Sequence, residues 1–388
     1  MKKLFNNLLV KLVIAVIGGL LIGFKATENV MNVVVTLKHI FGQVIFFAVP
    51  LIIIGFIAPS IAKLKSNASK LLVYAVGIAY ASSVGAALFS AIAGYTIIPN
   101  LNIQSTTASL KELPNLIFKL DIPQVMPVMS ALVLSIILGL AVTWTKADLF
   151  EKLLNEFQNI VLSVVKRIVI PVLPFFIATT FAALAYEGSI TNHLPVFIKV
   201  IAIVLIGHFI WTALLYIIGG VIAKKNPMDV IRNYGPAYMT AIGSMSSAAT
   251  LPVSLTCAKK STALREDITD FAIPLCANIH LCGSVLTEVF FVMVVSQVLY
   301  GTLPNISSMI LFIILLGVFA IGAPGVPGGT VMASLGLISS VLGFNETGTA
   351  LILTIFALQD SFGTACNVIG DGAVALILTG IANKKNIK

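Results

Sequence analysis

A glycine- and proline-rich run splits one of the most apolar segments of this chain. Residues 310–342 read ILFIILLGVFAIGAPGVPGGTVMASLGLISSVL, with GAPGVPGG at 322–329. Proline and glycine leave backbone groups that hydrocarbon cannot satisfy, so such a break must be buried in protein or line a wet cavity. Each apolar flank holds about 10–15 residues, too few for a separate crossing. We therefore predict that 306–343 enters the membrane and returns as a re-entrant helical hairpin.

A second interrupted segment lies earlier in the chain. Residues 234–258 read YGPAYMTAIGSMSSAATLPVSLTCA, apolar at both ends and rich in Ser, Ala and Thr at the centre. Each interrupted segment precedes a helix that carries polar residues, 268–298 and 348–382. Paired interrupted segments in corresponding positions indicate the binding site of a secondary transporter. The alternative, two kinked ordinary spans, would place the charge clusters on the wrong sides.

The composition is that of a polytopic membrane protein. The chain has 388 residues, of which 58% are hydrophobic and 10% charged, whereas soluble domains average about 25% charged. We read the N-terminal apolar stretch as a retained first helix rather than a signal peptide, and 98–123 as an external loop. The predicted spans are 8–24, 39–62, 70–97, 124–145, 157–186, 196–222, 268–298 and 348–382.

The net charge of +9 follows the positive-inside pattern and does not indicate nucleic-acid binding. With a cytoplasmic N-terminus, most basic residues fall on the cytoplasmic side, including clusters near 2–3, 63–70, 146–167, 224–225, 259–265 and 384–388. This predicts a multi-pass protein of the plasma (inner) membrane with both termini in the cytoplasm.

The last span carries polar residues along one stripe. In 355–378, IFALQDSFGTACNVIGDGAVALIL, the residues Asp360, Thr364, Asn367 and Asp371 recur at i, i+4, i+7 and i+11, with Gly363 beside them. At about 100° per residue they share one helical face. Helix-helix hydrogen bonding is the alternative to a ligand site. Two carboxylates favour the ligand site, because each costs several kcal/mol at the bilayer centre.

These motifs together resemble the dicarboxylate/amino acid:cation symporter family, the glutamate-transporter homologues. The likeness rests on the serine-rich tip at 246–254, the tip at 322–329 and the pattern at 360–371, and it extends from about residue 8 to 382. It implies an all-α fold of eight transmembrane helices and two re-entrant hairpins, built from inverted repeats and working as an elevator in a homotrimer. The implied scaffold comprises 1–66 and, with the external loop, 101–190; the implied transport domain comprises 67–100 and 191–388.

The resemblance also implies residue roles at a substrate site. Asp360 would hold a substrate amino group, and Thr364 and Asn367 would contact the substrate beside the first tip. The remaining implied contacts come from the two tips: Ser246, Ser247, Gly325 and Val326. Acidic-substrate members carry arginine where this chain has Gly363, so we expect a neutral amino acid.

Sodium sites follow from the same resemblance. One would use the Asp371 carboxylate with backbone carbonyls of Cys276, His280 and Asn367. Another would use carbonyls alone, from Asn278, Ala320, Ile321 and Ala323. A third is predicted to be lost, because the family aspartate is replaced by Cys282 and the matching stretch 74–79 offers Ala75, Ile78 and Ala79 in place of hydroxyls. We therefore expect about two coupled sodium ions.

His280, Ser284 and Glu288 recur at i, i+4 and i+8 and are predicted to share a helical face. One interpretation is a hydrogen-bonded interior histidine and a satisfied carboxyl group. The other is a proton carrier at His280 and Glu288, since histidine titrates near neutral pH.

The sequence thus predicts a sodium-driven symporter of a neutral amino acid, with Na+ as the coupling ion and H+ as a second candidate. Alternatives on the same fold are proton coupling and an acidic or dicarboxylate substrate. A channel or substrate sensor is a further class. A thiol-dependent membrane enzyme is disfavoured, because Cys282 and His280 lie two residues apart and would point to different sides of a helix. We predict that the protein is not an enzyme.

Overall fold

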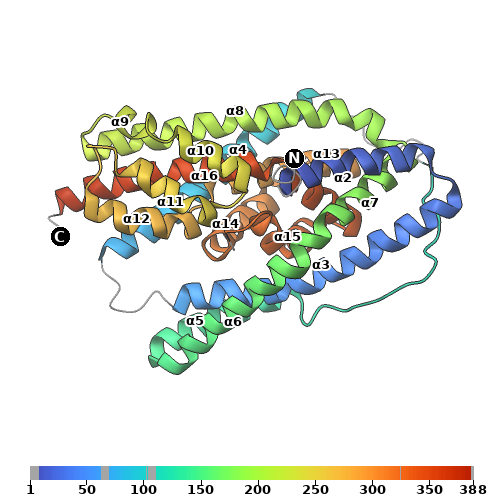
Figure 1. The fold of residues 1–388 in the computed structure, drawn as a ribbon, viewed down its shortest axis with the longest axis horizontal. Coiled ribbons are helices and arrows are strands. Elements are labelled where there is room, and N and C mark those ends of the chain that lie inside the picture. Colours follow the sequence, from blue (N-terminus) through green and yellow to red (C-terminus); the bar gives the residue numbers. More distant parts are fainter. Residues whose placement is uncertain (1–7, 63–69, 102, 104–110, 324, 386–388) are drawn as a thin grey trace.

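A computed structural model describes residues 8–62, 70–101, 103, 111–323 and 325–385 of the chain. Within these ranges every regular element is a helix, and most helices run along the longest axis of the molecule (Figure 1). The two chain ends, for which we predicted a cytoplasmic location, lie outside the described residues.

The N-terminal half supplies long apolar helices. They are α2(Leu8–Lys25), α3(Glu28–Ala62), α4(Lys70–Ile97) with a 3-10 turn at Ile98–Leu101, α5(Val128–Thr145), α6(Asp148–Val164), α7(Ile170–Glu187) and α8(Ser189–Ala223). A π-helical turn at Val165–Val169 joins α6 to α7.

The C-terminal half is built from shorter helices and one very long one. They are α9(Met228–Ile231), α10(Gly235–Ser244), α11(Ser247–Ala258), α12(Glu266–Ile279), α13(Cys282–Tyr300), α14(Ile306–Gly322), α15(Gly329–Leu342) and α16(Glu346–Lys384). Across the described residues, 6 helical stretches are long and apolar enough to cross a membrane.

Both interrupted segments form pairs of packed helices, as the sequence predicted. The first is α10 followed by α11, with Met245 in the left-handed conformation and Ser246 capping α11. The second is α14 followed by α15, and here Gly328 takes a left-handed conformation (φ +70). That backbone conformation favours glycine, because a Cβ atom would be strained in it. We call these pairs hairpin 1 (α10–α11) and hairpin 2 (α14–α15).

The prediction of an unbroken helix over 268–298 was wrong. Helix α12 ends at Ile279 and α13 begins at Cys282, with His280 and Leu281 in non-helical conformations between them. His280 therefore does not share a continuous helical face with Ser284 and Glu288. The break is stabilised from outside the segment, because α16 accepts hydrogen bonds from the first N–H groups of α13.

Glycines let α2 and α7 approach closely. Gly19 and Gly23 form a G-x-x-x-G pattern on α2, a pattern typical of tight helix pairs in membranes. A Cβ atom at Gly19 would lie 2.2 Å from the carbonyl oxygen of Ala178, and one at Gly23 would lie 2.2 Å from that of Ala182. Both contacts are with backbone, so a side chain would force the helices apart.

We therefore expect Gly23→Leu to lower the melting temperature of the purified protein by several degrees, since overpacking costs about 1–3 kcal/mol or more. Gly18→Leu is the matched control, because a Cβ atom at Gly18 meets nothing within 4 Å. Equal melting temperatures for the two variants would contradict this packing.

The helices pack mainly in two sets. Helices α2, α3, α5, α6 and α7 pack on one another, while α4 and α8–α16 form the second set around α16. The two sets meet closely where hairpin 2 reaches α3: a Cβ atom at Gly322 would lie 3.0 Å from Cα of Ile57.

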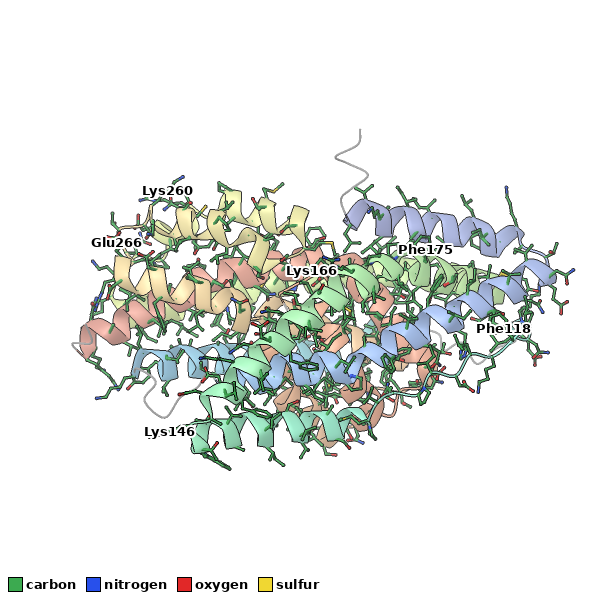
Figure 2. All side chains as sticks on the ribbon, turned by 60° about the horizontal axis from the view of Figure 1, so that its bottom comes forward. Phe118, Lys146, Lys166, Phe175, Lys260 and Glu266 are labelled. Carbon is green, nitrogen blue, oxygen red and sulfur yellow. The ribbon has the colours of Figure 1, made fainter. Side chains whose placement is uncertain are left out.

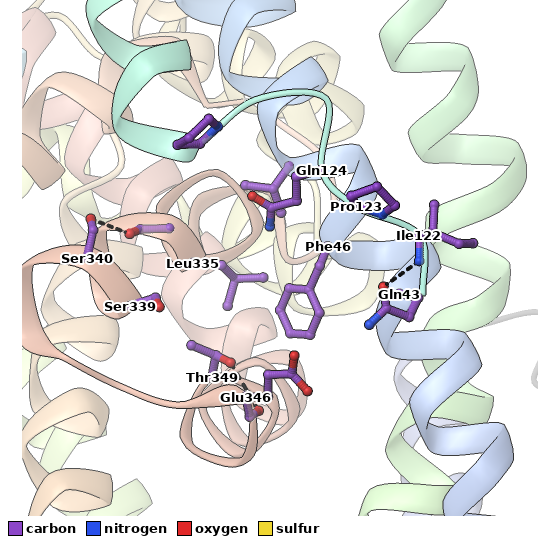
Figure 3. Close-up of a pocket in the computed structure, with 13 residues that line it drawn as sticks. Gln43, Phe46, Ile122, Pro123, Gln124, Leu335, Ser339, Ser340, Glu346 and Thr349 are labelled. Atoms are coloured by element: carbon purple, nitrogen blue, oxygen red, sulfur yellow. Dashed lines mark hydrogen bonds between the residues drawn. The ribbon is translucent and has the colours of Figure 1, made fainter. Parts of the chain in front are cut away.

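Another part of the boundary between the two sets is hollow. A cavity of about 410 Å³ lies between α3 with the 122–127 segment and α15 with the first turn of α16 (Figure 3). Gln43 and Phe46 line it from α3, and Glu346 lines it from α16. The interface between the two sets is thus tight near Ile57 and hollow near Gln43.

The basic residues labelled in Figure 2 are not spread evenly. Lys146 and Lys260 lie at one end of the long axis, whereas Phe118 lies at the other. Lys166 lies nearer the middle.

Candidate functional site

The four polar residues of the predicted stripe lie on one unbroken helix, α16, and all are buried. Asp360 and Thr364 are each 4% exposed, and Asn367 and Asp371 are each 1% exposed. Buried carboxylates need partners. The partners of these residues show which elements surround the stripe.

Asp360 faces the tip of hairpin 2. The backbone N–H of Gly328 donates to Oδ2 of Asp360 at 2.6 Å. This contact places the start of α15 directly over the carboxylate. An ionised carboxylate offers about four acceptor positions, so it can hold a further donor, such as a ligand ammonium group.

The tips of the two hairpins touch each other. The hydroxyl of Ser246 donates to the carbonyl oxygen of Gly325 at 2.6 Å, and its oxygen accepts from the N–H of Ala249 as the N-cap of α11. A Cβ atom at Gly325 would lie 3.5 Å from Ala248. Val326, next to Gly325, is partly buried against the core. The two predicted tips therefore meet, and the site lies in a closed arrangement.

The side-chain amide of Asn367 is hydrogen-bonded to the first residues of α13. Its Oδ1 accepts from the N–H groups of Gly283 (2.7 Å) and Ser284 (3.2 Å), and its Nδ2 donates to the Ser284 hydroxyl at 2.9 Å. The amide group carries two N–H bonds, so one remains for a ligand. The sequence did not indicate this capping role.

Gly363 lies where α13 and α16 come close together. A Cβ atom there would be 3.4 Å from Cα of Ser284, and one at Gly283 would be 2.5 Å from the carbonyl oxygen of Gly363. The small residue at 363 therefore has a packing role besides the substrate role that we expect for it.

Helix ends surround the stripe. The N-termini of α13 and α15 donate to it, through Gly283 to Asn367 and through Gly328 to Asp360. The N-terminus of α11 instead contacts hairpin 2, through Ser246. Helix N-termini carry partial positive charge, so they favour an anionic group such as a carboxylate nearby.

Two helix C-termini supply carbonyl groups instead. Asn278 lies in the last turn of α12, and Ala320, Ile321 and Ala323 lie at the end of α14. Helices α12 and α14 are in contact. The last carbonyls of a helix lack intrahelical partners, and hard cations take oxygen ligands of this kind.

Asp371 is held by a residue from the break between α12 and α13. Nδ1 of His280 lies 3.0 Å from Oδ1 of Asp371, and Nε2 of His280 lies 2.8 Å from Oγ of Ser82 on α4. His280 is fully buried. Ser82 is not among the site residues that the sequence predicts. It lies one turn beyond Ala75 and Ala79 on the same helical face, which is the signal that could have found it.

Glu288 lies apart from His280, on α13. One of its oxygens accepts from the Ser334 hydroxyl of α15, while the other has no hydrogen-bond partner among the residues described. It is fully buried. The two residues predicted as proton carriers are therefore held by different partners.

The base of hairpin 1 is tied by Asp229, just outside the long helices. Its Oδ2 accepts from the Ser261 hydroxyl at 2.9 Å and from the N–H groups of Thr262 (2.8 Å) and Ala263 (3.0 Å). The Ser261 hydrogen bond, with those from Thr262 and Ala263, holds the pKa of Asp229 below its usual value. The carboxylate joins α9 to the segment that follows α11.

The chain is similar in sequence to known excitatory amino acid transporters. The chain is 27% identical over 228 residues to excitatory amino acid transporter 2 of Mus musculus, covering 57% of this chain and 39% of that protein. It is 26% identical over 265 residues to excitatory amino acid transporter 3 of Bos taurus, covering 67% and 49% respectively. These matches span less than half the length of either relative.

The match to a family model is more extensive and runs over residues 8–381. It covers all the helices that build the site, including both hairpins and α16. The protein is a multi-pass membrane protein by its apolar helices and by this match. The chain belongs to the sodium:dicarboxylate symporter family.

Proposed function

We propose that this protein is a secondary active symporter that takes up a neutral amino acid, driven by a sodium gradient across the plasma membrane. The observation that carries the proposal is the setting of Asp360. Its buried carboxylate lies under the tip of hairpin 2, and the N-termini of α13 and α15 both donate hydrogen bonds to the same stripe.

This setting matches the two charges of an amino-acid zwitterion. The ammonium group needs one carboxylate, which Asp360 provides, and a charge-assisted hydrogen bond of that kind is strong. The substrate carboxylate needs hydroxyl and N–H donors, which Ser246, Ser247, Thr364 and Asn367 would provide, and the nearby helix N-termini would add partial positive charge. Gly325 and Val326 cover the substrate from hairpin 2.

We propose a neutral substrate because both charged residues of the stripe are carboxylates. A second carboxylate on the substrate would lie near Asp360 and Asp371 without a cationic partner at position 363, which is glycine. Like charges in a buried site repel strongly. An acidic or dicarboxylate substrate is the competing possibility, since the family name includes dicarboxylates.

For sodium we propose two positions. One uses Asp371 with carbonyls of Cys276, His280 and Asn367, and the other uses the C-terminal carbonyls of α12 and α14. The site that would require an aspartate at 282 is proposed to be lost, because Cys282 is a fully buried thiol and sodium prefers hard oxygen ligands.

We propose an elevator mechanism in a homotrimer with eight transmembrane helices. The scaffold would comprise 1–66 and 101–190, and the transport domain would comprise 67–100 and 191–388. The uneven interface supports a sliding movement, because it is packed at Gly322 and Ile57 but hollow at Gln43 and Phe46. Both termini would be cytoplasmic.

A competition assay tests the substrate class. Purified protein in liposomes is assayed by sodium-dependent counterflow with a panel of amino acids and dicarboxylates. We expect neutral amino acids to compete at least about tenfold more strongly than glutamate, aspartate or succinate, a difference of about 1.4 kcal/mol. Preference for an acidic competitor would reject the neutral class and leave the symporter proposal standing.

Gradient-driven uptake into the same liposomes tests proton coupling. Glu288 is buried beside Ser334 with one oxygen unpartnered among the described residues, which is the reason to retain this alternative. Uptake that follows a pH gradient and is weakened in Glu288→Gln would support a proton carrier. Uptake driven by sodium alone at every pH would reject it.

A thiol-dependent enzyme is disfavoured, because both ring nitrogens of His280 are already hydrogen-bonded.

A further inference from the structure

One imidazole ring joins three helical elements in the middle of the molecule. His280, at the break between α12 and α13, contacts Ser82 of α4 through Nε2 and Asp371 of α16 through Nδ1. All three residues are buried, with Ser82 6%, His280 0% and Asp371 1% exposed. No water is needed to complete this chain of contacts.

The ring fits closely against α16. A Cβ atom at Gly370 would lie 2.8 Å from Cε1 of His280, so glycine at that position makes room for the imidazole. With Nδ1 protonated, the ring donates to the Asp371 carboxylate and its Nε2 accepts from the Ser82 hydroxyl. A histidine held by a partner on one nitrogen has a fixed tautomer and a fixed ring plane.

The contact leaves the second oxygen of Asp371 available. The hydrogen bond of His280 goes to Oδ1 of Asp371, at 3.0 Å. A carboxylate whose one oxygen is fixed by a hydrogen bond presents the other in a defined direction, as outer partners of metal-binding carboxylates do.

We propose that Ser82 and His280 are positioning residues, which orient the Asp371 carboxylate for a sodium ion and so set sodium affinity. This inference rests on the proposed function and adds to it the residue Ser82 and a role for the side chain of His280. Ser82 acts through His280 and does not itself touch the ion.

The neighbouring serine offers a matched control. Ser83 follows Ser82 on α4 and is 1% exposed, but its hydroxyl has no hydrogen-bond partner among the described residues. Ser82→Ala and Ser83→Ala remove the same atom from the same helix at similar burial. Only the first removes a partner of His280.

The experiment measures sodium binding without substrate or transport. Melting temperatures of purified wild type, Ser82→Ala and Ser83→Ala are recorded over a sodium titration, with choline holding ionic strength constant, since a ligand that binds the native state stabilises it by mass action. We expect the apparent sodium dissociation constant to rise about tenfold in Ser82→Ala and to stay at the wild-type value in Ser83→Ala.

Two further variants keep the test decisive. Ser82→Cys retains a weak donor and is expected to give an intermediate shift. Ser82→Ala added to His280→Gln is expected to give little additional shift, because residues in one network are not additive. The inference would be overturned by an unchanged apparent sodium dissociation constant in Ser82→Ala. It would also be overturned if that constant changed equally in Ser82→Ala and Ser83→Ala. Absence of sodium stabilisation in the wild type would instead reject the proposed sodium coupling.

Discussion

Asp360→Asn is expected to remove amino-acid binding while the protein still folds. The substrate ammonium loses its carboxylate, and truncating one partner of a buried charge pair costs about 2–5 kcal/mol, which is roughly a 30- to 5,000-fold loss of affinity. Folding is spared, because the asparagine oxygen can still accept from the N–H of Gly328, the contact that holds the tip of hairpin 2.

Isothermal titration or scintillation-proximity binding at saturating sodium measures this loss. Asp267→Asn is the control, since Asp267 is a half-exposed carboxylate near the start of α12 that pairs with Arg265. The control is expected to bind as the wild type does. If Asp360→Asn retained wild-type affinity for zwitterions, the substrate site would have to lie elsewhere.

Asp371→Asn is expected to weaken sodium dependence first and substrate affinity second. Asparagine can still accept from His280, so the local hydrogen bond survives, but the negative charge that attracts the cation is lost. We expect the sodium concentration for half-maximal uptake to rise at least about tenfold. Substrate affinity at fixed sodium falls as a consequence, because two coupled ligands change each other's affinity by the same factor.

Sodium titrations of uptake at several substrate concentrations separate the two effects. In Asp371→Asn, substrate affinity should recover as sodium is raised, whereas in Asp360→Asn it should not. Sodium stimulation that survives unchanged in Asp371→Asn would make Asp371 a structural residue, partnered only by His280.

The hairpins and the polar stripe could be predicted from the sequence because their signals are local. The dense run of glycine and proline at 322–329 interrupts a helix by its local composition. The spacing of Asp360, Thr364, Asn367 and Asp371 depends only on helical periodicity. Both features are present in the structure as helices α14, α15 and α16.

The break between α12 and α13 could not be predicted in this way. Residues 280–281 are His and Leu, which are not helix breakers, and the freed N–H groups of Gly283 and Ser284 are satisfied by Asn367, up to 84 residues away in the chain. The contact of His280 with Ser82 likewise joins residues 198 apart. Such partners emerge only when the helices pack, as does the close approach of Gly363 to Ser284.

Accumulation in liposomes tests the central claim most directly. Purified protein is reconstituted, a radiolabelled neutral amino acid is supplied outside, and an inward sodium gradient is imposed. The account predicts a transient internal concentration several-fold above the external one, which collapses when the sodium ionophore monensin removes the gradient. Equilibration to equal concentrations, with or without the gradient, would indicate a channel or facilitator and contradict sodium-coupled symport.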